Sequence, residues 1–333
     1  MPAADSVRTL NDRPGRVCVV GSLNVDLTVH TERMPVPGET LRGGELGILP
    51  GGKSANQAAA AGFAGAKVDM LGAAGSDANG DLVLGFLNRA GVDTSHVHRV
   101  DAPTGTAIIT VADGGENTIV TSAGANAAVD VAMVEAEADL IAGADIVGLG
   151  LEINIEAVTR AAQIAHEAGV PVLVNLSPYQ ESLPTDLLDA TDILVVNETE
   201  LAQLLAESAA SRNVNIRVPD DAHSSYWPLI LSELASRGFT RTAVTMGGKG
   251  AVILDAHSDR SVSPIEPTRV EVVDTTGAGD CFMGTLLAGF AADLTPGEAA
   301  RLANRAAAAS TTRWGAMTSY LPIAEILAEE PPA

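Results

Sequence analysis

Short apolar runs alternate with longer segments of helical character along most of this chain. The first run, 16–26 (RVCVVGSLNVD), ends in Gly and polar residues, which predicts a buried strand that delivers a loop. An Ala-rich segment, 54–66, predicts a helix with Ser54 as its N-cap. Residues 67–75 then predict a strand, and 80–91 predict a helix that a glycine ends.

The second half keeps this rhythm of strand and helix. The predicted pairs are 144–152 with 154–169, 170–178 with 184–189, and 192–197 with 198–207, before a strand at 240–247. Such alternation predicts an α/β fold with a doubly wound, mostly parallel sheet and helices on both faces. Ligands of these sheets bind beyond the carboxyl ends of the strands. The polar residues at those ends are therefore candidates for one site: Asn24, Asp26, Glu152, Asn175 and Asn197.

Two segments break the rhythm with β-rich patterns. Residues 27–50 alternate and are rich in Pro and Gly, which predicts a small exposed sheet or flap, and 104–121 predict a hairpin about Gly114-Gly115. Residues 207–225 are polar and irregular, and we interpret them as a surface insertion. The opening residues, 1–15, have no apolar core of a signal peptide and are expected to form a disordered tail before a single domain, 16–330.

The composition of the chain excludes several classes of function. The 333 residues are 46% hydrophobic, enough for a large core, and the formal charge of −22 argues against a nucleic-acid or anionic-membrane surface. No apolar run is long enough to cross a bilayer convincingly. The two cysteines, Cys18 and Cys281, form no CxxC pair, so neither a zinc site nor a disulfide framework is implied, and a reducing cytoplasm fits.

Candidate chemistry gathers in 273–282, VDTTGAGDCF. Gly277, Ala278 and Gly279 lead into Asp280 and an apolar helical segment. One interpretation is a simple helix start with capping residues. The other is a pocket in which backbone N–H groups at a helix N-terminus hold an anion while the acid accepts a proton.

A second glycine-rich motif is a misleading match. Residues 47–54 (GILPGGKS) fit the G-x-x-x-x-G-K-S pattern of a phosphate-binding P-loop. A P-loop follows directly on a buried strand, whereas LRGGEL precedes this motif, and Pro50 removes a backbone donor. A glycine turn before a helix explains the motif as well.

Taken together, the motifs carry a resemblance that none carries alone. The blocks GSLNVD, PGET, GGKSANQAAAAG, AGANAAV, NETE and DTTGAGD occur in the order found in the PfkB, or ribokinase-like, family of carbohydrate kinases, from about Arg16 to about Leu327. The resemblance implies a doubly wound α/β domain with a small β-sheet lid, formed here from about 27–50 and 98–121. It implies ATP-dependent phosphorylation of a sugar, with D-ribose at its 5-hydroxyl favoured by Asp26 and the GGKSANQ block.

The resemblance also assigns roles to individual positions. Asp280 would be the general base, and the amides of Gly277, Ala278 and Gly279 would form the anion hole. The expected sugar contacts are Asn24, Asp26, Gly52, Lys53, Ser54, Ala55, Asn56, Glu152 and Asp280. One lysine against two or three acids favours a neutral polyol over a phosphorylated sugar.

For the nucleotide, the family's NxxE motif matches Asn197, near the phosphates, and Glu200, which would order Mg²⁺ through water. First-turn acids of a helix are the alternative explanation for Glu200. The remaining nucleotide contacts implied are Thr245, Met246, Gly247, Gly248, Lys249, Gly250, Gly279 and Asn304. A K⁺ site beside the anion hole would use the Asp274 carboxylate, the backbone carbonyls of Thr276, Ser310, Arg313 and Gly315, and the Ser319 hydroxyl.

The resemblance implies a homodimer formed through the lid sheets and leaves other functions open. A family kinase for deoxyribose, fructose, a nucleoside or an acidic keto-sugar would share the same blocks. A non-catalytic sugar-binding protein would keep the fold, but retention of Asp280, the glycine turn, Asn197 and Glu200 argues against it. Cys281, Trp314 and Met317 depart from the family's usual residues without removing a catalytic group.

Overall fold

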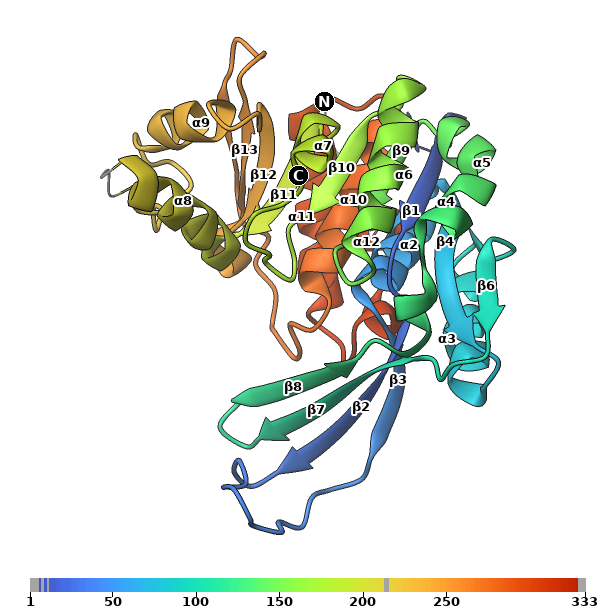
Figure 1. Ribbon diagram of the computed structural model, residues 1–333. Coiled ribbons are helices and arrows are strands. Elements are labelled where there is room, and N and C mark those ends of the chain that lie inside the picture. Colours follow the sequence, from blue (N-terminus) through green and yellow to red (C-terminus); the bar gives the residue numbers. More distant parts are fainter. Residues whose placement is uncertain (1–5, 7–8, 11, 213–215, 329–333) are drawn as a thin grey trace.

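In the residues that it describes, the computed structural model contains a ten-stranded, mostly parallel central sheet (Figure 1). It describes the chain except for residues 1–5, 7–8, 11, 213–215 and 329–333, and the side chains of 207–212. The strand order is β14-β13-β12-β11-β10-β9-β1-β4-β5, with β6 paired to β4, and only the pairs β12–β13 and β13–β14 are antiparallel. The strands are β1 (Arg16–Val20), β4 (Lys67–Gly75), β5 (Val92–Asp93), β6 (Val97–Val100), β9 (Ile146–Leu149), β10 (Val172–Asn175), β11 (Ile193–Asn197), β12 (Arg241–Thr245), β13 (Ala251–Asp255) and β14 (Val262–Ile265).

Helices cover both faces of this sheet because alternate strand residues point to opposite sides. In β1, Val17 and Val19 join one hydrophobic core, whereas Cys18 and Val20 join the other. The first core is covered by α2 (Lys53–Phe63), α3 (Ala78–Arg89), α10 (Ala278–Ala291), α11 (Pro296–Ser310) and α12 (Ile323–Ala328). The second is covered by α4 (Val131–Ala136), α5 (Ala138–Ala142), α6 (Ile155–Glu167), α7 (Thr185–Asp189), α8 (Glu198–Arg212) and α9 (Trp227–Ala235).

A separate four-stranded sheet, hereafter the lid, projects from the carboxyl end of the central sheet in the described part of the chain (Figure 1). Its order is β3 (Gly47–Gly51), β2 (Asn24–Thr31), β7 (Gly105–Ala112) and β8 (Asn117–Ser122). The His30 ring on β2 contacts the Trp314 ring edge-on, with centroids 5.9 Å apart. The lid therefore touches a loop that follows α11.

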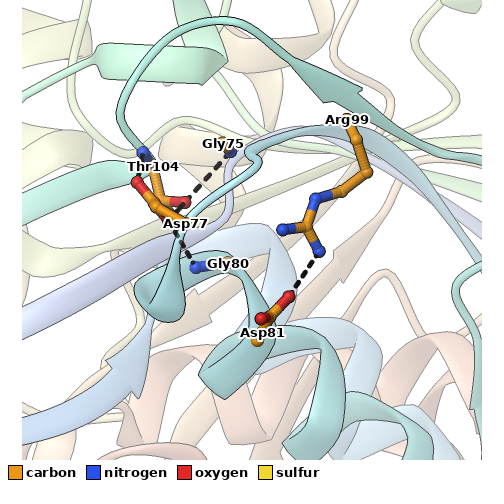
Figure 2. A network of polar contacts seen from close by, with 6 residues as sticks. All are labelled: Gly75, Asp77, Gly80, Asp81, Arg99 and Thr104. Carbon is orange, nitrogen blue, oxygen red and sulfur yellow. Dashed lines mark hydrogen bonds and ion pairs between the residues drawn. The ribbon is translucent and has the colours of Figure 1, made fainter.

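Polar contacts hold two of the lid strands, β7 and β2, where each begins beside the core. Figure 2 shows Asp77, the N-cap of α3, beside Thr104, which stands just before β7. Asp77 accepts hydrogen bonds from the Thr104 amide at 2.8 Å and hydroxyl at 2.6 Å, and the Thr104 hydroxyl accepts one from the Gly75 amide. The start of β2 is held by the buried side chain of Asn126. This side chain accepts a hydrogen bond from the Leu23 backbone amide and donates to the Leu23 carbonyl and the Asn24 side chain. Asn126 lies in the short 3₁₀ turn η1 (Gly124–Ala128).

The predicted fold class is confirmed, but some boundaries differ. The run 16–26 is two strands, because the chain turns at Gly21-Ser22 and β2 enters the lid. Residues 97–100 pair with β4 in the core, so the lid does not include the start of the predicted segment 98–121. The hairpin about Gly114-Gly115 is present as β7 and β8.

The predicted N-cap of α2 is wrong. Gly52 occupies that position with φ 93°, and a side chain there would place its Cβ 2.6 Å from the Asn24 amide nitrogen. Ser54 instead lies inside the helix with its hydroxyl buried, and that hydroxyl has no partner among the described residues. A glycine with positive φ can therefore start a helix without a side-chain cap.

The structure describes part of the predicted tail and part of the predicted insertion. The predicted disordered tail, 1–15, is described only in part. Leu10 is 1% exposed and belongs to the first core, so the chain is packed against the domain at that residue. In the insertion 207–225, α8 continues through Arg212, residues 213–215 lie outside the description, and irregular chain runs from 216 to α9. No described helix combines the length and apolar character needed to cross a membrane.

Candidate active site

Two cavities meet where the carboxyl ends of the central strands face the N-termini of α2, α8 and α10. A polar cavity of about 160 Å³ has Lys53, Asn175, Glu200 and Asp280 among the residues that line it. A larger cavity of about 690 Å³ lies between β11–β12 and α10–α11. The two share Asn197, Thr245 and Gly279 in their linings, so they form one continuous space. The cavities lie at the carboxyl ends of the strands, where ligands of such sheets bind, and Asn175 and Asn197 are the predicted strand-end residues that line them.

The turn before α10 is built around Gly277. This residue has φ 73°, and an added Cβ would lie 2.7 Å from both the Tyr320 hydroxyl and the Ala316 Cβ. The Tyr320 hydroxyl donates to the Gly277 carbonyl at 2.7 Å, which fixes the turn. Gly279, two residues further along, has no atom within 4 Å of its added Cβ and lines both cavities.

The backbone amides of this turn are only partly available to a ligand. The Ala278 amide donates to the Thr275 carbonyl at 3.2 Å, so one of the amides predicted for the anion hole is already bonded. The amides of Gly277 and Gly279 have no acceptor in the part of the chain that the structure describes. Because they stand at the positive end of the helix dipole, an anion in the cavity would be stabilised there.

Asp280 lies at the floor of the polar cavity and is 8% exposed. The side-chain amide of Asn56 donates to Oδ2 of Asp280 at 2.9 Å, and the side-chain amide of Gln57 donates to Oδ1 of Asp280 at 3.0 Å. Both donors come from α2, which packs directly on α10. Burial raises the pKa of Asp280, and the positive charge of Lys53 and the two amide donors oppose that rise.

A cluster of acids surrounds one lysine beside Asp280. Burial, together with the charges of Asp280 and Glu152, raises the pKa of Asp26 from 3.8 to about 6. The same acids act on Lys53, whose pKa is raised chiefly by Asp280 despite its burial. An added Cβ on Gly51 would lie 2.4 Å from the Asp26 carboxylate oxygens, so only glycine fits beside them. A neutral ligand with several hydroxyls suits this cluster, because carboxylates accept hydroxyl hydrogen bonds.

The other predicted sugar contacts divide into two groups. Glu152 accepts from the Ser22 hydroxyl at 2.6 Å and from the Lys53 amide at 3.4 Å, which holds it next to the start of α2. Asn24 is 6% exposed and accepts from Asn126. Ser54 and Ala55 are fully buried within α2. Of the predicted sugar contacts, only Lys53 and Asp280 line the polar cavity. The linings of these two cavities do not include the others: Asn24, Asp26, Gly52, Ser54, Ala55, Asn56 and Glu152.

The larger cavity is lined by glycine-rich loops on one side and apolar side chains on the other. It brings together most of the residues predicted for the nucleotide: Asn197, Thr245, Gly247, Gly248, Gly250, Gly279 and Asn304. Pro267, Val270, Val272 and Phe282 add apolar walls that suit a planar base. Met246 is instead buried in the second core, and Lys249 is paired with Glu198 at 2.8 Å, so neither lines this cavity among the described residues.

Asn197 and Glu200 interact with each other at the start of α8. The Asn197 side chain accepts from the Glu200 amide at 2.9 Å, and the Glu200 carboxylate accepts from the Asn197 amide at 2.8 Å. This reciprocal pair is a capping box, so both residues have a structural role in the helix. Glu200 also lines the polar cavity, and one carboxylate there suits Mg²⁺, which retains most of its waters in proteins.

The predicted K⁺ ligands lie in two segments, the turn before α10 and the stretch from the end of α11 to Ser319. Asp274 accepts from the Thr276 amide and hydroxyl and from the Gly315 amide at 2.9 Å, which joins this loop to the turn before α10. The hydroxyls of Ser310 and Ser319 donate to the carbonyls of Ala307 and Ala316. A carboxylate with nearby hydroxyl and carbonyl oxygens is a donor set that fits a monovalent cation.

Sequence reasoning missed several residues of the site. Gln57 lies within the quoted block GGKSANQ but was not selected, although its position next to Asn56 on a buried helix could have suggested it. Asn126 lies in the block AGANAAV and supports Asn24. The wall at 267–272 carries no motif, since its contribution to the cavity is shape and apolar surface. The P-loop match at 47–54 spans β3 of the lid and the start of α2, with no buried strand before it.

Comparison with known proteins agrees with this geometry. The model of the pfkB family of carbohydrate kinases matches residues 15–324. A ribokinase of Schizosaccharomyces pombe is 36% identical over 321 residues, covering 93% of this chain and 96% of that protein. A ribokinase of Haemophilus influenzae is 34% identical over 302 residues, covering 90% and 94%. The solved structure of Arabidopsis thaliana ribokinase complexed with ribose and ATP superposes with a TM-score of 0.84 at 29% identity, covering 95% of this chain and 98% of that one.

Proposed function

The chain belongs to the pfkB family of carbohydrate kinases, and from this membership and the geometry of the site we propose that it transfers the γ-phosphoryl group of ATP to the 5-hydroxyl of D-ribose. Ribokinases from distant organisms match over nearly their whole length, and one of them is solved with ribose and ATP. The product would be ribose 5-phosphate.

One observation carries the proposal. A buried carboxylate, Asp280, lies at the N-terminus of α10 where a polar cavity opens into a cavity of nucleotide size. Phosphoryl transfer requires mainly positioning and stabilisation of charge on the transferring group. An acceptor hydroxyl in the polar cavity and a triphosphate reaching past Gly279 would meet at this carboxylate.

Asp280 is proposed to accept the proton of the attacking hydroxyl. General-base assistance of this kind contributes about 10²–10⁴-fold to rate. Burial raises the pKa of Asp280 and makes it a stronger base than an exposed aspartate, while Lys53, Asn56 and Gln57 oppose that rise and favour the ionised form. The amides of Gly277 and Gly279 would stabilise the negative oxygens of the transferring group.

The sugar is proposed to lie between the lid and the acidic cluster. Asp26 from the lid strand β2, Glu152 and Asn24 offer acceptors and an amide to vicinal hydroxyls. Lys53 balances part of the negative charge. Gly52 lets the start of α2 approach the lid strand that carries Asp26, because an added Cβ would lie 2.6 Å from the Asn24 amide nitrogen.

Two ions complete the proposal. Glu200, with Asn197 beside it, would hold Mg²⁺ through water, and the ion would neutralise charge on the nucleotide phosphates. The Asp274 carboxylate, the Ser319 hydroxyl and the backbone carbonyls of Thr276, Ser310, Arg313 and Gly315 would hold K⁺. Since Asp274 bonds the Gly315 amide and the residue after Thr276 starts the glycine turn, occupancy of this site would act on the shape of the anion hole.

The lid supports the proposal of a homodimer. Its strands expose large apolar side chains, among them Ile108 at 53% and Val120 at 66%, which share one face of the lid. A second lid packed on that face would cover them. Size-exclusion chromatography with light scattering of the wild type and of Ile108→Glu tests this, and an unchanged mass would contradict it.

A reducing compartment is proposed from the two free, buried cysteines, Cys18 and Cys281.

A sugar panel tests the function. Purified protein with ATP, Mg²⁺ and K⁺ should phosphorylate D-ribose with a higher kcat/KM than deoxyribose, fructose, an acidic keto-sugar or a nucleoside, and ³¹P NMR should identify the 5-phosphate. Asp280→Asn should lower kcat by at least about 10²-fold. A higher kcat/KM for another acceptor would change the substrate, and full turnover by Asp280→Asn would refute the base. Ribose binding without turnover by the wild type would indicate a sugar-binding protein.

A further inference from the structure

Gln57 follows Asn56 in α2, and its completely buried side chain contacts Asp280. Its exposure is 0%, and its Nε2 donates to Asp280 Oδ1 at 3.0 Å. Asn56 donates to the other carboxylate oxygen. Each oxygen of the proposed base therefore receives one amide donor, which fixes the plane of the carboxylate.

The other half of the Gln57 amide is left unsatisfied. Its Oε1 is buried and has no hydrogen-bond partner among the described residues. Burying an unpaired amide oxygen is destabilising, and a methionine of similar volume would avoid that cost. The N–H group, which does have a partner, is thus the half of the side chain with an evident use.

Backbone packing fixes the reach of Gln57. An added Cβ on Gly284 of α10 would lie 2.1 Å from the Gln57 carbonyl oxygen, so the two helix backbones are in direct contact there. Asp280 stands one turn earlier on the same helix. The distance between the Gln57 amide and the carboxylate is therefore set by a rigid helix pair.

We propose that Gln57 is a positioning residue of the reaction, which holds the Asp280 carboxylate in the orientation and the ionised form that proton acceptance requires. The inference rests on the proposed role of Asp280 as base. Donation from Gln57 lowers the pKa of Asp280 against the rise that burial causes. The charged and titratable groups that act on this carboxylate or share its cluster are Lys53, Asp26, Glu152, Glu200, Cys281 and Tyr320.

Removal of this donor should move the pH profile. A hydrogen bond to a charged group is worth enough to shift a pKa by about one to two units. In Gln57→Met the acid limb of kcat should therefore move up by about one to two pH units, with kcat recovering toward the wild-type value above it. Gln57→Glu sets a second carboxyl against Asp280, and shared protonation should move the limb at least as far.

The experiment compares kcat and ribose affinity across pH for the wild type, Gln57→Met, Gln57→Glu and a matched control. The control is Gln163→Met, which removes a glutamine that donates to Asp186 at 3.1 Å on the surface of α6. We expect melting temperature and ribose Kd to change little in Gln57→Met, with Kd within about two-fold, while its acid limb moves and that of the control does not.

Several outcomes would overturn the inference. Equal loss of kcat at every pH with an unmoved limb, or no loss at all, would show that Gln57 does not act on Asp280. Failure of both variants to fold would make Gln57 a structural residue. Asp280→Asn separates this result from the proposed function, because full turnover there refutes the base itself, whereas an inactive Asp280→Asn beside a wild-type profile in Gln57→Met refutes the role of Gln57 alone.

Discussion

Gly277 and Gly279 stand two residues apart in the same turn, yet the structure predicts opposite consequences for replacing them with alanine. Gly277 has a positive φ, and its added Cβ would overlap the Tyr320 hydroxyl and the Ala316 Cβ at 2.7 Å. Gly279 has helical surroundings and no atom within 4 Å of the added Cβ. The pair therefore separates the folding role of the turn from its role toward a ligand.

The magnitudes follow from these contacts. For Gly277→Ala, the left-handed backbone costs about 1–2 kcal/mol and overpacking about 1–3 kcal/mol, so we expect a loss of about 3 kcal/mol in the free energy of unfolding. With an unfolding entropy of about 2.1 cal/mol/K per residue over 333 residues, this loss lowers Tm by about 4 °C. For Gly279→Ala, removal of backbone freedom in the unfolded chain should raise stability by up to about 1 kcal/mol.

Activity should not follow stability in this pair. The alanine methyl at position 279 would project into the space shared by both cavities, where the transferring phosphoryl group is proposed to pass. Displacement of a reacting group by about 1 Å, or loss of one anion-hole donor, lowers kcat by about 10²-fold or more. Gly279→Ala should therefore be at least as stable as the wild type in urea unfolding and about 10²-fold slower in a coupled ADP-release assay. Wild-type turnover by a folded Gly279→Ala would refute the anion-hole argument.

Three further predictions concern other parts of the site. Because the folded state keeps a proton on Asp26 between pH 3.8 and about 6 that the unfolded chain has released, stability of the unliganded protein should fall as pH rises through that window; urea unfolding should show this dependence reduced in Asp26→Asn. Asn126→Ala leaves the buried Leu23 amide unpaired and should cost about 1–3 kcal/mol in urea unfolding, more than Asn154→Ala, whose exposed amide ties the same segment at Ala127 and Val129. Stimulation of ribose phosphorylation by K⁺ should exceed that by Na⁺ and should disappear in Asp274→Ala; equal rates with and without K⁺ in the wild type would contradict the cation site.

The sequence predicted those parts of the molecule that depend on local pattern. Strand β4 and the hairpin of β7 and β8 were found because apolar alternation and a Gly-Gly turn are visible along a few residues. Asp280 was selected because its position after the glycine turn matches the family's catalytic acid, and the structure places it, buried, in the lining of the polar cavity. Strand ends gave Asn175 and Asn197 as site residues because topology alone brings such ends together.

Features that depend on packing between distant segments were not predictable in the same way. Whether Gly52 or Ser54 begins α2 depends on the approach of Asn24 from the lid, 28 residues or more away in sequence. The bond from Gln57 to Asp280 joins residues 223 positions apart. The engagement of the Ala278 amide by Thr275, and that of Glu200 by Asn197, are details of cap geometry that residue types alone leave open.

The contact between His30 and Trp314 should make the intrinsic tryptophan fluorescence sensitive to the position of the lid. The chain has two tryptophans: Trp227 is fully buried and its indole donates to the Asp221 carbonyl, whereas Trp314 is 66% exposed against the lid. Emission from Trp227 should stay constant and blue, while the red component from Trp314 should change whenever His30 moves away. Because Gly315, the next residue, donates to Asp274, a cation bound at Asp274 should also change this emission. Motion of the lid could then be timed in a stopped-flow instrument without any attached dye.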